Sequence, residues 1–164
     1  MKGEWSLPRA ADTERLGALL AGSCPWEESG PRLLFLSGEL GTGKTTLAAA
    51  VLAALGVSET VRSPSYALLE SYELACGQAM HLDCYRLSDA KELEQLGLRD
   101  YYRHGVLWLV EWPERGGSSL PVPDLLLRLE VERQGRRAQI EAHSPAGTRW
   151  LNVLEQQRGS QSSS

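Results

Sequence analysis

The stretch LLFLSGELGTGKTTLAAAVL, residues 33–52, restricts the fold more than any other part of the chain. It begins with LLFLS, an apolar run up to its last residue, which is typical of a strand covered on both faces. Residues 44–55 have the apolar periodicity of a helix, which Gly56 ends. The glycine-rich turn between them matches G-x-x-x-x-G-K-[ST], the P-loop pattern. We therefore expect an α/β fold that binds the phosphates of a nucleotide.

The P-loop residues form a chemically coherent set. Glycines let successive backbone N–H groups surround a phosphate, and the helix that follows directs the positive end of its dipole at the same phosphate. Lys44 would reach the β- and γ-phosphates, and the Thr45 hydroxyl would bind Mg²⁺. A chance glycine-rich turn is the alternative, but the flanking strand and helix argue against it. The predicted nucleotide-binding residues are Gly38, Glu39, Leu40, Gly41, Thr42, Gly43, Lys44, Thr45 and Thr46.

The rest of the chain alternates strand and helix patterns. We expect a strand at 4–9, a helix at 11–22, a hairpin over 61–87, a short helix at 88–98, a buried strand at 105–112 and a second hairpin over 124–143. This order predicts a P-loop NTPase-like three-layer α/β fold with a mixed parallel and antiparallel central sheet. Residues 1–155 would form a single P-loop ATPase domain, and the polar tail 156–164 would be disordered.

Composition excludes several classes of protein. The chain has 164 residues, of which 42% are hydrophobic and 23% charged, as in soluble globular proteins. Its net charge of -4 argues against autonomous binding to a nucleic acid backbone. Three cysteines without a C-x-x-C pair argue against a disulfide framework or a zinc site. No apolar run approaches the ~18 residues of a membrane span, so we expect a cytoplasmic protein without a membrane association.

The sequence also indicates which nucleotide base the protein would bind. A guanine-reading N-K-x-D motif cannot exist, because the single asparagine of the chain is Asn152. We therefore expect ATP rather than GTP.

A second acidic residue is needed to complete a P-loop site. Glu111 ends the buried run VLWLV and resembles a Walker B acid, which would hold Mg²⁺ directly or through water. It could instead be an ordinary solvated residue at the end of a strand. Because it is a glutamate rather than an aspartate, it could also position a water molecule.

The segment HLDCYRL places polar residues on one side of a predicted strand. His81, Asp83 and Tyr85 would share one face, and Leu82 and Cys84 the other. Asp83 could bind the metal or orient the attacking water. The alternatives are a polar face on an edge strand and a structural hydrogen bond between His81 and Tyr85.

Two further segments are candidates for the site. In RSPSY, Pro64 keeps Ser63 out of a helix, and the position of Ser63, Pro64, Ser65 and Tyr66 after the P-loop helix is similar to that of a switch segment. A plain connecting loop fits equally well. Arg136 belongs to the basic cluster 133–137 near a hairpin turn. It could contact nucleotide, a partner or tRNA, or form part of a solvated hairpin tip.

Taken together, these segments resemble one family. SGELGTGKTTL, RSPSYALLESY, HLDCYRL, LEQLGLRDY and LVEWPERG occur in the order found in the TsaE family, also called YjeE. The resemblance covers residues 5–142, and H-x-D-x-Y-R-L with E-W-P-E is its most specific part. One departure is Ser65, where the family usually has threonine.

The resemblance implies an activity and its partners. The family contains the bacterial ATPase of tRNA threonylcarbamoyladenosine biosynthesis, which binds ATP and Mg²⁺ and hydrolyses ATP weakly alone. It acts on TsaB and TsaD, which modify the adenosine next to the anticodon, so contact with tRNA would be indirect. By this resemblance Lys44, Asp83 and Glu111 are catalytic, and Thr45 and Glu111 hold Mg²⁺. Trp112 would lie beside the site, and residues 63–66 would be switch-like.

Two other activities fit a small P-loop protein. A small-molecule kinase needs an acceptor pocket and a lid with arginines that bridge the phosphates. Here Arg99 and Arg103 are the candidates for such a lid. A module that senses ATP without useful turnover is the second alternative.

Overall fold

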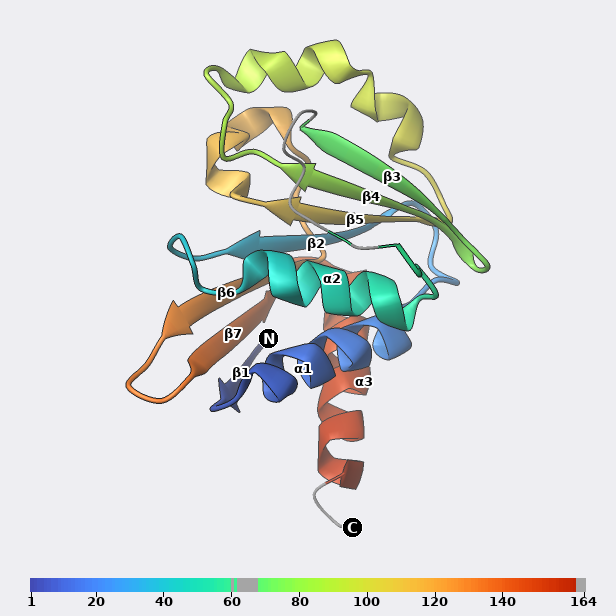
Figure 1. Cartoon of the computed structure of the whole chain (residues 1–164). Helices are drawn as coiled ribbons and strands as arrows, with labels where there is room; N and C mark the ends of the chain where they lie inside the picture. Colours follow the sequence, from blue (N-terminus) through green and yellow to red (C-terminus); the bar gives the residue numbers. More distant parts are fainter. Residues whose placement is uncertain (60, 62–67, 162–164) are drawn as a thin grey trace.

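The central element of the protein is a mixed sheet that lies between two layers of helices (Figure 1). The computed structural model describes residues 1–59, 61 and 68–161. Within them the sheet has seven strands: β1 (Lys2–Leu7), β2 (Arg32–Ser37), β3 (Leu69–Leu74), β4 (Gly77–Asp83), β5 (Val106–Glu111), β6 (Leu125–Val131) and β7 (Arg136–Ala142). Their order is β1-β7-β6-β2-β5-β4-β3. The predicted α/β, P-loop NTPase-like fold is confirmed.

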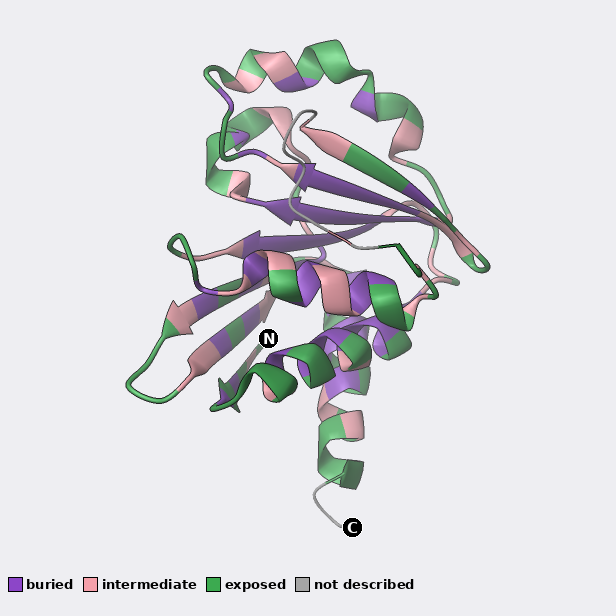
Figure 2. Ribbon diagram, viewed as in Figure 1, coloured by how far each residue is buried: buried purple, intermediate pink, exposed green. Residues whose placement is uncertain are grey.

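The four central strands are parallel and the outer ones are antiparallel. β6, β2, β5 and β4 run in the same direction, so their carboxyl ends meet at one edge, on the left in Figure 1. β1 and β7 at one side and β3 at the other are antiparallel to their neighbours. All six residues of β5 are buried, as expected for a strand covered on both faces (Figure 2).

Alternate residues of each central strand face different helical layers. Leu34 and Leu36 of β2 pack with α1 (Ala10–Ser23), α2 (Lys44–Ala54) and α3 (Pro145–Gln161). Leu33 and Phe35 pack on the opposite side with η1 (Ala90–Leu96) and η2 (Leu98–Tyr101), two short 3₁₀-helices. Two more 3₁₀-helices, η3 (Pro113–Arg115) and η4 (Gly117–Ser119), follow β5. The predicted short helix at 88–98 is therefore present as 3₁₀ structure.

The strand β4 is shorter than the sequence pattern indicates. It ends at Asp83, whose side-chain Oδ1 accepts a hydrogen bond from the backbone N–H of Tyr85 at 3.0 Å. An aspartate that bonds to the backbone two residues later turns the chain instead of continuing a strand. The prediction that Tyr85 lies on the same strand face as His81 and Asp83 is therefore wrong.

The helix α3, which the sequence patterns did not predict, extends into the predicted disordered tail. Residues 156–161, predicted to be disordered, form the last turns of α3, so that part of the prediction is wrong. Arg158 explains the difference: its Nη1 donates to the carbonyl oxygen of Glu4 at 2.6 Å, and its guanidinium lies 4.6 Å from the ring centre of Trp5. These contacts with β1 hold a segment whose composition alone favours disorder. Residues 162–164 lie outside the described part.

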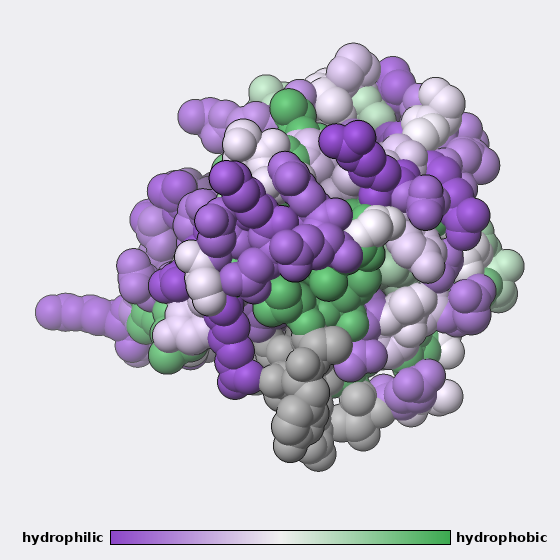
Figure 3. Space-filling view, turned by 90° about the horizontal axis from the view of Figure 1, so that it is seen from above, coloured by the Kyte–Doolittle hydropathy of each residue, from purple (hydrophilic) through white to green (hydrophobic). Residues whose placement is uncertain are grey.

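The face of the molecule seen from above is mostly polar. Hydrophilic side chains there surround a smaller hydrophobic area (Figure 3). Within the described ranges, no helix combines the length and the apolar character that crossing a membrane requires.

Candidate nucleotide and metal site

The carboxyl ends of three parallel strands bring the predicted site residues to one edge of the sheet. β2 leads into the P-loop and α2, while Asp83 and Glu111 end β4 and β5 and lie opposite one another in the register. Ligands of open α/β sheets bind at such an edge. A cavity of about 510 Å³ opens here, lined by Leu40, Gly41, Gly43, Lys44, Thr45, Thr46, Asp83, Tyr85, Arg86, Glu111 and Trp112.

The P-loop adopts a backbone conformation that requires glycine. The φ angles of Gly38, Gly41 and Gly43 are 140°, 80° and 103°, a region that residues with a Cβ rarely adopt. A Cβ on Gly38 would also lie 2.4 Å from the carbonyl oxygen of Leu129 in β6. The glycines therefore let the turn curl tightly and let its first residue pack directly on the neighbouring strand.

Lys44 is held inside the P-loop. Its side chain is nearly buried, with 5% exposed, and Nζ donates to the carbonyl oxygens of Gly38 and Glu39 at 2.7 and 2.9 Å. Nζ also lies 4.2 Å from the centre of the Trp112 ring. Burial lowers the pKa of Lys44, and the negative charge of Glu111 opposes this effect. The ammonium group thus has its partners within the protein, beside the cavity at the P-loop edge.

Glu111 connects the P-loop helix to β4. Only 2% of the residue is exposed, and its Oε1 accepts a hydrogen bond from the Thr45 hydroxyl at 2.8 Å. Its Oε2 lies 2.6 Å from Nε2 of His81, which is completely buried. The two predicted metal-binding residues therefore touch. The partner of His81 is Glu111, so the alternative of a hydrogen bond between His81 and Tyr85 is wrong.

Trp112 follows Glu111 in an unusual backbone conformation. Its φ of 55° is the only positive value at a non-glycine residue in the described part of the chain. Such a conformation costs of order 1–3 kcal/mol and occurs mostly where a site requires it. The ring lies against Tyr85, with 4.9 Å between ring centroids, and 5.7 Å from the guanidinium of Arg115. The expectation that Trp112 lines the site agrees with this position.

The sequence patterns did not identify two arginines that lie at this edge of the sheet. Arg86 lines the cavity, and the guanidinium of Arg115 stacks 4.9 Å from the ring centre of Tyr85. Both lie in the quoted segments: Arg86 is part of H-x-D-x-Y-R-L, and Arg115 comes directly after E-W-P-E in LVEWPERG. Their positions in these segments could have indicated that both arginines lie near the site.

Arg136 supports the P-loop from its outer side. From the start of β7, Nε donates to the carbonyl oxygen of Thr42 at 3.1 Å and Nη2 to that of Gly41 at 3.2 Å. It also lines a second cavity of about 250 Å³, to which Pro8, Thr13 and the P-loop contribute. Gly43 and Thr46 line both cavities, so the two are adjacent. The predicted switch-like residues 63–66 lie outside the described residues.

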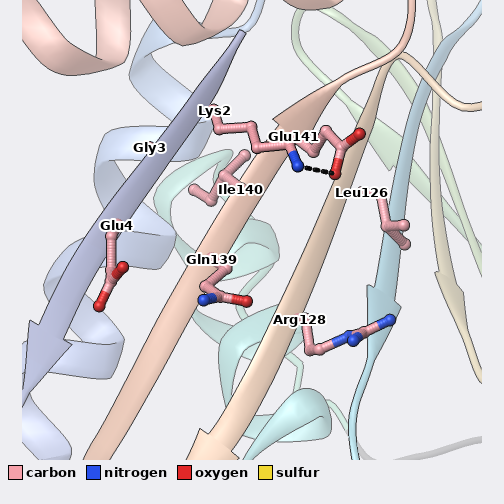
Figure 4. Close-up of a pocket in the computed structure, with 8 residues that line it drawn as sticks. All are labelled: Lys2, Gly3, Glu4, Leu126, Arg128, Gln139, Ile140 and Glu141. Atoms are coloured by element: carbon pink, nitrogen blue, oxygen red, sulfur yellow. Dashed lines mark ion pairs between the residues drawn. The ribbon is translucent and has the colours of Figure 1, made fainter.

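Another hollow of about 420 Å³ lies on the face of β1, β7 and β6 (Figure 4). Lys2 and Glu141 point toward one another there and form an ion pair at 3.7 Å. Arg128 and Gln139 lie further along the same face. This hollow contains none of the predicted site residues.

The residues at the P-loop edge suit a magnesium ion that a nucleotide helps to bind. The described residues contain no group of three or more His, Cys, Asp or Glu side chains that could hold a metal. Thr45 and Glu111 supply a hydroxyl and a carboxylate, the hard oxygen donors that Mg²⁺ prefers. Mg²⁺ typically takes one or two carboxylates, with phosphate and water oxygens as its other ligands. The pair therefore fits a Mg²⁺–nucleotide site.

Comparison with known proteins identifies the family. A family model described as "Threonylcarbamoyl adenosine biosynthesis protein TsaE" matches residues 7–140, most of the chain. The chain belongs to the TsaE family. A TsaE protein of Haemophilus influenzae is 38% identical over 122 residues, which cover 74% of this chain and 77% of the relative. A TsaE protein of Bacillus subtilis is 31% identical over 124 residues, covering 76% of each chain.

A solved structure supports the fold. The protein described as "Crystal structure of Bacillus subtilus YdiB" superposes with a TM-score of 0.75 at 22% identity, covering 96% of this chain and 95% of the other. The range that matches the TsaE model includes the whole P-loop edge and Arg136, but it ends before α3 begins. Both relatives carry the name tRNA threonylcarbamoyladenosine biosynthesis protein. The TsaE family is thus involved in this tRNA modification.

Proposed function

We propose that this protein is a Mg²⁺-dependent ATPase that supports threonylcarbamoylation of the tRNA adenosine next to the anticodon. It would act on a complex of TsaB- and TsaD-like proteins, be weakly active alone and work in the cytoplasm. The observation that carries the proposal is the contact between Thr45 and Glu111, which joins the P-loop to a buried acid on another strand. Membership of the TsaE family supplies the pathway.

The nucleotide would occupy both adjacent cavities. The phosphates would lie over the backbone N–H groups of the P-loop, with Lys44 turned toward them. The smaller cavity beside Arg136, of about 250 Å³, would take part of the nucleoside, because it lies directly next to Gly43 and Thr46. In this arrangement Arg136 fixes the P-loop and borders the bound nucleotide.

Thr45 and Glu111 would hold Mg²⁺, which neutralises charge on the phosphates when it is bound. Asp83 lies beside Glu111 in the register and lines the same cavity, so it can accept a hydrogen bond from a water molecule there. We assign it the orientation of the attacking water, with Glu111 contributing charge and Lys44 stabilising the transferred phosphoryl group.

The kinase alternative finds less support. Arg103, one of the two candidate lid arginines, donates to the side chain of Gln78 at 3.2 Å. Gln78 is near the start of β4, at the sheet edge opposite to the P-loop. The net charge of -4 also suits a protein that acts on a partner complex and reaches tRNA indirectly.

Phosphate release from Mg²⁺–ATP, measured with and without the TsaB and TsaD proteins, tests the proposal. We expect slow release alone and stimulation by the partners. Lys44→Ala should abolish ATP binding in calorimetry, and an unchanged affinity would contradict the P-loop assignment. In a reconstituted modification reaction, Asp83→Ala and Glu111→Ala should bind ATP but support little product. Full tRNA modification in the presence of either variant would favour a module that senses ATP without turnover. A phosphorylated product from a panel of metabolites would favour a small-molecule kinase.

A further inference from the structure

His81 is a buried polar residue whose one hydrogen bond leads to the candidate metal ligand. The side chain is completely buried, and Nε2 lies 2.6 Å from Oε2 of Glu111. Its other ring nitrogen, Nδ1, is buried and has no hydrogen-bond partner among the residues that the structure describes. A buried polar atom without a partner destabilises a protein, and an apolar side chain would avoid that cost. Packing alone therefore does not explain a histidine here.

The proposed role of Glu111 sets the direction of this hydrogen bond. A carboxylate that binds a metal ion can only accept hydrogen bonds, so Nε2 of His81 would be the donor to Glu111. Nδ1 makes no hydrogen bond to any described residue. The ring thus acts on a single atom, Oε2 of Glu111.

We propose that His81 is a positioning residue that fixes the direction of the Glu111 carboxylate. With Oε2 held by His81 and Oε1 by Thr45, both carboxylate oxygens are anchored. A glutamate has one more rotatable bond than the aspartate usual at this position, so it needs such a restraint more. Each oxygen keeps lone-pair capacity for a metal ion. The inference rests on the proposed function, since it gives Glu111 the role of a Mg²⁺ ligand.

A pair of variants of similar size separates the hydrogen bond from packing. In the full chain, His81→Gln keeps an amide N–H near the position of Nε2, whereas His81→Met has a similar length and no donor. Partners that orient metal ligands typically contribute about 10–100-fold to metal affinity or activity. For His81→Met we expect a decrease of this size in kcat and a matching rise in the Mg²⁺ concentration for half-maximal ATP binding. ATP affinity measured in EDTA should stay unchanged.

Rescue is the deciding result. His81→Gln should restore most of the Mg²⁺ dependence and kcat, and His104→Ala, at an exposed histidine bonded to the carbonyl of Glu28, should behave as wild type. Equal Mg²⁺ dependence in folded His81→Met and wild type would overturn the proposal. If wild type itself shows no Mg²⁺-dependent ATP binding, the proposed function fails instead.

A spectroscopic measurement tests the geometry without any activity. In ¹⁵N-histidine NMR of the full chain, His81→Gln assigns the signal of His81 among the three histidines. We expect a proton on Nε2 and a shift of the Nε2 signal in Glu111→Ala. The proposal would be overturned by a proton on Nδ1 with none on Nε2, or by an Nε2 signal that does not shift in Glu111→Ala. Either result holds even if His81→Met does not fold.

Discussion

The hydroxyl of Thr45 donates a hydrogen bond of 2.8 Å to Oε1 of Glu111, across 66 positions of the sequence. Thr45 lies in the first turn of α2 and Glu111 at the end of β5. β2, which leads into α2, pairs in parallel with β5, and Leu36 lies opposite Glu111. The topology of the sheet therefore creates the contact, and it defines the candidate metal site.

Removal of the charge on Glu111 should stop hydrolysis while the fold persists. Glu111→Gln keeps an oxygen that can accept from Thr45, but it removes the negative charge that attracts Mg²⁺. We expect phosphate release in the presence of the partners to fall by about 100-fold or more. Glu114→Gln removes the same charge from an exposed residue nearby and should change the rate by less than about twofold. Similar rates for the two variants would rule out Glu111 as a metal ligand.

Trp112 should report nucleotide binding by fluorescence. Its ring lies 4.2 Å from Nζ of Lys44, so a phosphate that draws Lys44 away changes the surroundings of the indole. In Trp112→Phe we expect most of the ATP-induced change in intrinsic emission to disappear. Trp26→Phe is the control, because Trp26 precedes β2 at the opposite end of that strand from the P-loop. A response that persists in Trp112→Phe and disappears in Trp26→Phe would contradict this placement.

Arg136 should contribute to ATP affinity through the P-loop backbone. Two charged hydrogen bonds join its guanidinium to the carbonyls of Thr42 and Gly41. Because hydrogen bonds to charged groups contribute about 1.5–3 kcal/mol, we expect Arg136→Ala to weaken ATP binding by about 10-fold in calorimetry. Arg133→Ala alters the same hairpin at an exposed residue and should leave the affinity unchanged. Equal affinities for the two variants would show that the P-loop holds its shape without Arg136.

The buried thiol of Cys84 should make stability fall at alkaline pH. Burial raises the pKa of Cys84 from 9.0 to about 12. Above pH 9 the unfolded thiol loses its proton while the folded one keeps it, so the unfolded state is favoured by about 1.4 kcal/mol per pH unit for this residue. Below pH 8 the thiol is protonated in both states and adds no pH dependence.

Urea unfolding at pH 8 and pH 10 checks this sign. The free energy of unfolding should fall less between the two pH values in Cys84→Ala than in wild type. Cys76→Ala changes an exposed thiol and should keep the wild-type slope. A slope in Cys84→Ala as steep as that of wild type would assign the pH dependence to other groups.

Local patterns in the sequence were sufficient for the central elements. The apolar runs of β2 and β5, the P-loop glycines and the capping box of Asp89 and Glu92 each depend on neighbouring residues, and each is present. Local patterns could not predict contacts between segments that are distant in the sequence. The bond from His81 to Glu111 depends on how β4 and β5 pair, and the last turns of α3 depend on contacts of Arg158 with β1.

The site residues show the same division. Periodicity placed His81 and Asp83 on one face, but the turn that Asp83 makes with the N–H of Tyr85 ends the strand and separates Tyr85 from them. Arg86 and Arg115 escaped notice because an arginine near a motif is usually an exposed surface residue. Arg115 stacks on Tyr85 from η3, which follows Trp112, and Arg86 lines the cavity from the segment after β4.

Lys44 has its partners inside the P-loop edge itself. Its ammonium group contacts two carbonyl acceptors and an aromatic ring, so groups of the protein stabilise its positive charge. In the proposed ATP complex, phosphate oxygens would compete with the carbonyls of Gly38 and Glu39 for this ammonium group. The contribution of Lys44 to the affinity for ATP would then be the difference between these two sets of bonds.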